Sequence, residues 1–181
     1  MNFISGLAPI DRILLVSLVA IAAVFDIRFR RIPNWLNLAA LLLGLAANAY
    51  LAGLHGLGRS ALGFAVGFGL YFPLFLLHAR GAGDVKLLAA VGSIAGPGNC
   101  FAIFLLAAVL GGALAVVLLI FKRRLGKTLW NVGWILKDLS QFKAPFAANP
   151  ELDVNSPEAL RLPHGAVIAL GVFAFLAISR V

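Results

Sequence analysis

Charged residues are scarce in this chain of 181 residues, of which 12% are charged and 62% are hydrophobic. Soluble domains carry roughly 25% charged residues and about 45–50% apolar residues. A chain of this composition lacks the polar side chains needed to cover a surface that faces water. We therefore expect a single domain, residues 1–181, whose main solvent is lipid.

Cysteine is almost absent, and the few histidines are scattered. Cys100 is the single cysteine, which excludes an internal disulfide and a four-cysteine zinc site. His55, His78 and His164 show no metal-ligand spacing such as His-x3-His. We therefore expect neither a metal nor another cofactor. The first apolar stretch also lacks a preceding basic segment, so we expect it to be retained rather than cleaved as a signal peptide.

Apolar stretches fill most of the chain. They run near Ile10–Phe25, Trp35–Leu54, Ala61–Leu77, Val85–Ala95, Phe101–Phe121 and Ala166–Ile178. The longer ones approach the ~20 residues that cross about 30 Å of hydrocarbon as a helix. The pattern predicts an all-α, polytopic membrane bundle of about six transmembrane helices. The fourth reaches a useful length only if its helix begins near Gly81.

Positive charge is distributed unevenly along the chain. If the N-terminus faces outward and every apolar stretch crosses, all Lys and Arg residues except Arg12, Arg59 and Arg180 lie on the cytosolic side. Such a bias is what the positive-inside rule predicts for a membrane protein. The net charge of +8 is thereby explained by topology, and we expect no nucleic-acid partner.

The basic stretch 122–163 is predicted to be a cytosolic loop. Within it, apolar residues recur at intervals of three and four over about 125–142. This spacing predicts an amphipathic helix that lies on the inner face of the membrane. The alternative is a helix packed on the bundle without lipid contact.

Two of the seven acidic residues stand out. Asp26 and Asp84 each lie where an apolar stretch meets a cytosolic loop, and the number of crossings between them places both on one side. Ionisable groups there are costly unless they are partnered or functional. Two carboxylates that share a site can activate water and protonate a leaving group. The alternative is that each pairs with a nearby Arg or Lys. Asp11 is expected to pair with its neighbour Arg12.

Both acids belong to short motifs. Asp84 lies in the string GAGDVK, residues 81–86, which opens an apolar helix, and Asp26 begins an Asp-x6-Pro-Asn string. We expect Gly83 to adopt a positive φ or to admit the backbone of a bound chain. On a helix, Lys86 points away from Asp84. It is therefore expected to bind a lipid phosphate or another helix.

Together these features resemble the type IV prepilin peptidases, in the short form that serves Flp/Tad pilus systems. The resemblance covers the apolar stretches, both motifs and the string LPHG at 162–165. It implies that Asp26 and Asp84 are the catalytic pair. It also implies that the residues shaping the substrate site are Gly81, Gly83, Lys86, Pro33 and Asn34, of which the last two are expected to start the second helix.

The same resemblance implies a substrate and a location. Family members cut prepilins or pseudopilins at the cytosolic face of the bacterial inner membrane, between a short basic leader and an apolar helix. The partners would thus be leader peptides, the lipid bilayer and the pilus assembly machinery. The larger family members also methylate the new N-terminus and carry Cys-x-x-Cys pairs. Because this chain lacks those cysteines, we expect a peptidase only.

Two other functions remain open from the residues alone. One is a small ion- or proton-coupled transporter with Asp26 and Asp84 as ligands, although transport sites usually lie nearer the membrane midplane. The other is a non-catalytic assembly factor for a pilus or secretion system.

Overall fold

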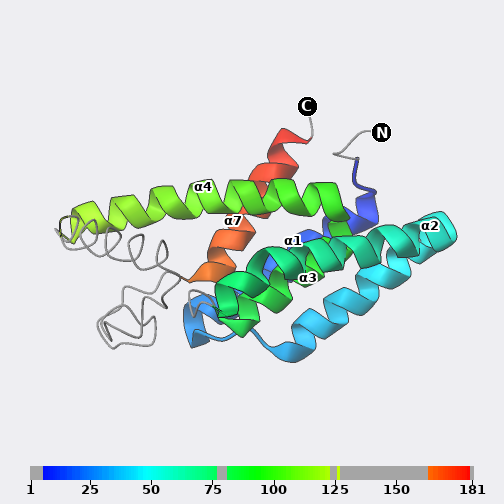
Figure 1. The fold of residues 1–181 in the computed structure, drawn as a ribbon, viewed down its shortest axis with the longest axis horizontal. Helices are drawn as coiled ribbons and strands as arrows, with labels where there is room; N and C mark the ends of the chain where they lie inside the picture. Colours follow the sequence, from blue (N-terminus) through cyan, green and yellow to red (C-terminus); the bar gives the residue numbers. More distant parts are fainter. Residues whose placement is uncertain (1–5, 77–80, 123–125, 127–162, 180–181) are drawn as a thin grey trace, which may run out of the picture.

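The computed structural model of the chain describes residues 6–76, 81–122, 126 and 163–179. These residues form the helices α1 (Pro9–Phe29), α2 (Asn34–Leu76), α3 (Ala82–Ala95), α4 (Pro97–Phe121) and α7 (His164–Ile178), as Figure 1 shows. The predicted all-α class is confirmed. The amphipathic helix predicted over 125–142 lies outside the described residues.

Helix α2 is a helical hairpin rather than one straight rod. Its backbone leaves helical geometry at Ala52 (φ −141°, ψ 20°) and Gly53 (φ 57°, ψ −139°). Gly53 can adopt the positive φ because it has no Cβ. The second and third apolar stretches of the sequence are therefore the two arms of α2. The arms touch near the bend, where Gly56 packs directly on the carbonyl group of Asn48.

Helix α3 forms the centre of the bundle, between the arms of α2 (Figure 1). All of its residues from 87 to 95 are buried, as expected for a helix that is apolar on every face. Gly63 of the second arm packs on the carbonyl of Gly92, and Gly67 packs on that of Leu88. Neither glycine has room for a Cβ, so small residues bring the two backbones together.

The C-terminal end of α3 lies inside the protein, where its carbonyl groups need donors. With 14 residues, α3 is about 21 Å long and thus shorter than the hydrocarbon layer. Side chains of α2 and α4 satisfy its last carbonyls, those of Ser93, Ile94 and Ala95; the donors are Asn48, Ser60, Arg59 and Asn99.

The exterior of the bundle is strongly apolar. Large hydrophobic side chains such as Val109 and Phe121 are 70% and 81% exposed. Extended apolar surfaces of this kind are rare on soluble monomers. Among the described helices, α2 and α4 are long and apolar enough to cross a membrane, and α7 is a shorter apolar helix. The number of crossings and their orientation stay predictions.

Candidate active site

Asp26 lies in the last turn of α1, and only 8% of its surface is exposed. Its Oδ2 atom accepts a hydrogen bond of 2.7 Å from the backbone N–H of Gly165, the second residue of α7. The first N–H groups of a helix have no partner within the helix, and a negative group placed there is favourable. The first turn of α7, which is distant from Asp26 in the sequence, therefore holds the Asp26 carboxylate in place.

Gly165 fits against Asp26 because it has no side chain. A Cβ atom at Gly165 would lie 3.1 Å from Cβ and 3.2 Å from Oδ2 of Asp26. Any larger residue would push the carboxylate away from the N–H group. The contact thus depends on a glycine at this one position of α7.

Asp84 lies in the first turn of α3 and is half-buried. Its backbone N–H donates to the carbonyl of Gly81 at 3.1 Å. Its Oδ2 atom lies 3.7 Å from the place where a Cβ of Gly81 would be, so the carboxylate turns back over the start of its own helix. Both acids are thus found at a helix N-terminus, Asp26 at that of α7 and Asp84 at that of α3.

The side chain of Ile32 connects the two acid-bearing segments. Its Cδ1 atom would lie 3.2 Å from a Cβ at Gly165, which binds Asp26, and 3.9 Å from one at Gly83, which precedes Asp84. Ile32 belongs to the connection between α1 and α2. The segments of the two acids, which are 58 positions apart in the sequence, are therefore neighbours around one side chain.

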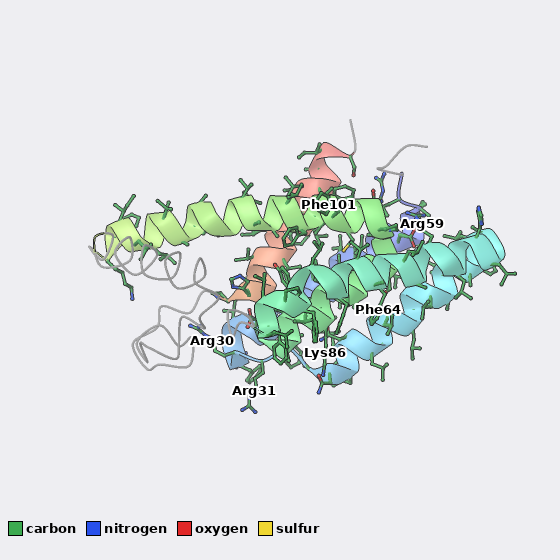
Figure 2. All side chains as sticks on the ribbon, viewed as in Figure 1. Arg30, Arg31, Arg59, Phe64, Lys86 and Phe101 are labelled. Atoms are coloured by element: carbon green, nitrogen blue, oxygen red, sulfur yellow. The ribbon has the colours of Figure 1, made fainter. Side chains whose placement is uncertain are left out.

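A hydrogen bond joins the two motifs a second time. The Nζ atom of Lys86 donates to Oδ1 of Asn34 at 2.9 Å, on the exposed face of the bundle; Figure 2 labels Lys86 there. The predicted bond from Lys86 to another helix is confirmed. Two predicted helix starts are confirmed as well, because α2 begins at Asn34 and α3 begins directly after Gly81.

One of the two alternatives for Gly83 is excluded, because it does not adopt a positive φ; among the described glycines only Gly53 and Gly96 do so, and Gly83 is part of the regular first turn of α3. The other alternative, that Gly83 admits the backbone of a bound chain, stays a prediction. The expectation for Asp11 is wrong. Asp11 is not an interfacial partner of Arg12. It is 1% exposed and interacts electrostatically with Arg59. Arg12 instead donates through Nε to the carbonyl of Leu7.

Sequence reasoning gave no role to Gly165 or Ile32. The string LPHG at 162–165 drew attention to the region of Gly165, because it marks the start of the last apolar helix. It did not indicate that the N–H group of Gly165 binds Asp26, 139 positions away. Nothing in the sequence around Ile32 indicated a role for it in the site.

A carboxylate held by a backbone N–H group, with a second acid on a neighbouring segment, has the groups needed for general acid–base chemistry on a bound amide. A model of the type IV leader peptidase family matches residues 13–116. The match includes both aspartates and ends before α7. No curated protein and no solved structure matches the chain.

Proposed function

The chain belongs to the type IV leader peptidase family, and from this premise we propose that it is an aspartic-type endopeptidase that removes the short basic leader from prepilins or pseudopilins. The observation that supports the proposal is that the segments carrying the two acids lie next to each other at one end of the bundle. Asp26 is held at the start of α7, Asp84 lies in the first turn of α3, and Ile32 contacts both neighbourhoods. Two nearby carboxylates are the minimal equipment for metal-independent hydrolysis of a peptide.

In the proposed reaction, one aspartate is ionised and the other is protonated, because two nearby carboxylates do not readily ionise together. The ionised group takes a proton from water, and the water oxygen attacks the scissile carbonyl carbon. The protonated group gives its proton to the amide nitrogen as the C–N bond breaks. The products are a leader with a new carboxyl group and a pilin with a new amino group. The N–H group of Gly165 keeps Asp26 oriented throughout.

We propose that this site faces the cytosol from a polytopic protein of the bacterial inner membrane. The apolar exterior of the bundle supports a lipid environment. Arg28, Arg30 and Arg31 are exposed at the end of the bundle that carries Asp26, and the latter two are labelled in Figure 2. Clustered Arg residues at a membrane boundary are typical of the cytosolic side.

The activity is tested by co-expressing the chain with a Flp-type prepilin and following the mobility shift that accompanies loss of the leader. We expect Asp26→Asn and Asp84→Asn each to lower processing at least about tenfold, since neither acid can replace the other's role. Asp138→Asn, a carboxylate outside both motifs, is the matched control and should process normally. Undiminished processing by either motif variant contradicts the assignment of that residue. A wild-type chain that never processes the prepilin would favour transport or assembly.

The meeting of the two motifs has its own test. A Cβ at Gly83 would lie 3.6 Å from that of Ile32, and disulfides span Cβ distances of roughly 3.5–4.5 Å. The pair Ile32→Cys and Gly83→Cys, in a Cys100→Ala background, should therefore cross-link rapidly when the purified protein is oxidised. Ile32→Cys with Gly69→Cys is the control, because nothing lies within 4 Å of a Cβ at Gly69. Equal cross-linking of both pairs would refute the proximity.

A further inference from the structure

The far end of α3 carries a second cluster of charged groups. An Nη atom of Arg59 donates to the carbonyl of Ala95, the last residue of α3, at 2.9 Å. The same side chain lies flat on the next residue, where a Cβ at Gly96 would collide with Nε of Arg59. Figure 2 shows Arg59 well away from Lys86, which marks the end of the bundle with the candidate active site.

Asp11 supplies the opposite charge in this cluster. It is buried in the first turn of α1, and the charge of Arg59 acts on it. Its Oδ1 atom is buried without a hydrogen-bond partner. The two charges are also oriented favourably, because Asp11 lies at a helix N-terminus and Arg59 at a helix C-terminus.

The packing of α3 against α2 indicates what this cluster does for the position of α3. The contacts that bring α3 close to α2 are made by glycines, Gly63 on Gly92 and Gly67 on Leu88. These van der Waals contacts set the distance between the two helices. Hydrogen bonds depend steeply on distance and angle. The bonds that Asn48, Ser60, Asn99 and Arg59 donate to the last carbonyls of α3 therefore help to define where α3 lies along its own axis, and the bond from Arg59 is made by a charged group.

A displacement at this end of α3 reaches the other end. Asp84 precedes Ala95 by 11 residues, which is about 16 Å of helix with continuous backbone hydrogen bonds. Near Asp84, the bond from Lys86 to Asn34 is exposed. Exposed polar contacts are weak, whereas those shielded from water are much stronger.

We propose that Arg59, which interacts with the buried Asp11, is a positioning residue for catalysis: it is one of the groups that fix α3 along its axis and so set the place of Asp84 relative to Asp26. The inference rests on the proposed peptidase function. In this proposal, Arg59 does not contact the substrate. Arg59 affects the reaction only by setting the position of Asp84, so its loss should change kcat without a matching change in KM.

The test compares Arg59→Gln with Arg59→Lys and with the matched control Arg12→Gln. Among the residues that the structure describes, Arg12 bonds within its own segment, to the carbonyl of Leu7. The purified full chain is assayed for cleavage of a prepilin in detergent. We expect Arg59→Gln to lower kcat by about 10- to 100-fold, as a misplacement of about 1 Å does, with KM changed less than about threefold. Arg59→Lys should recover part of the loss because it keeps the charge, and Arg12→Gln should behave as wild type.

A second readout does not depend on activity. The cross-linking rate of Ile32→Cys with Gly83→Cys reports the place of the start of α3, and Arg59→Gln should lower it. Asp11→Asn, which keeps Arg59 and the shape of the site, should lower both kcat and this rate, and it replaces Arg59→Gln if that variant does not fold. A lower melting temperature with wild-type kcat and wild-type cross-linking would show that the cluster only stabilises the fold, and would overturn the proposal.

The two readouts separate this proposal from the proposed function. If the wild-type chain cleaves no prepilin, the peptidase function fails, and the cross-linking rate still decides whether Arg59 positions α3. If cleavage is normal in wild type and the cross-linking rate is indifferent to Arg59→Gln and Asp11→Asn, the peptidase function stands and the positioning role is refuted.

Discussion

At the scale of single residues, two glycines near the acids differ in the space around them. A Cβ at Gly165 would press on Asp26 at 3.1 Å, whereas a Cβ at Gly83 would meet only Ile32, at an ordinary contact distance of 3.6 Å. A side chain at Gly165 would therefore force Asp26 to shift by a few tenths of an ångström. At Gly83 the protein has room, so any requirement for glycine would come from a bound substrate.

Gly165→Ala is expected to lower both stability and cleavage. The added methyl group displaces the Asp26 carboxylate and weakens its bond to the N–H group. Overpacking of this kind costs about 1–3 kcal/mol, and we expect at least a tenfold loss of kcat, on the order of what a small misplacement causes. Melting temperature and prepilin cleavage measure the two effects. A variant with normal melting and normal cleavage would show that Asp26 does not need this contact.

Gly83→Ala is expected to leave the melting temperature near that of wild type while cleavage falls. The chain accommodates the methyl group, but the position lies beside Asp84 in the first turn of α3, where an extended substrate has to approach. The measurement is the same pair of assays used for Gly165→Ala. Full activity in this variant would mean that the substrate backbone does not pass over Gly83.

At the scale of helices, the position of α3 depends on contacts from several other helices. Its faces meet glycines of α2, and its last carbonyls are bonded by side chains from other helices. A short helix can therefore end inside the bundle without leaving its carbonyls unsatisfied. The arrangement makes the position of α3 sensitive to single small residues of α2.

Two glycines of the second arm of α2 test this dependence. Gly63→Ala places a methyl group on the carbonyl of Gly92 and should lower the melting temperature by several degrees, as expected for overpacking of about 1–3 kcal/mol. Gly69 has open space around it, so Gly69→Ala should be neutral or stabilising, since alanine favours a helix over glycine by about 1 kcal/mol. Thermal unfolding in detergent compares the pair. Equal melting of both variants would contradict close packing at Gly63.

At the scale of the whole molecule, three features support the proposed membrane bundle with a site on one side: the apolar exterior, the uneven basic charge and the placement of both acid-bearing segments at one end. Gly58 lies near the bend of α2, at the opposite end from Arg30, and both residues are exposed. The two positions should therefore lie on opposite sides of the membrane.

In a Cys100→Ala background, we expect Gly58→Cys to react with an impermeant thiol reagent in intact cells, because the proposed topology places this end outside. Arg30→Cys should react only after the cells are made permeable, since the positive-inside rule places it in the cytosol. Gly126→Cys, also exposed, should follow Arg30→Cys. Labelling of Arg30→Cys but not of Gly58→Cys in intact cells would reverse the topology and place the site outside.

Much of the fold was predictable because its determinants are local. Long apolar runs indicate helices, and Pro33 and Gly81 mark the starts of α2 and α3, as proline and glycine commonly do at helix boundaries. Both aspartates were identifiable for the same reason, since each stands in a short motif at the end of an apolar run.

The contacts that shape the site were decided only by the tertiary structure. The bond from Gly165 to Asp26 joins residues 139 positions apart. Ile32 contacts the positions of Gly165 in α7 and Gly83 in α3, and nothing in the sequence around Ile32 indicates either contact. Asp11 interacts with Arg59 rather than with its neighbour Arg12, because side chains on adjacent helical positions point in different directions. Hydrophobic patterning determines which segments become helices. Which polar groups then meet depends on how those helices pack, and that is a property of the whole chain.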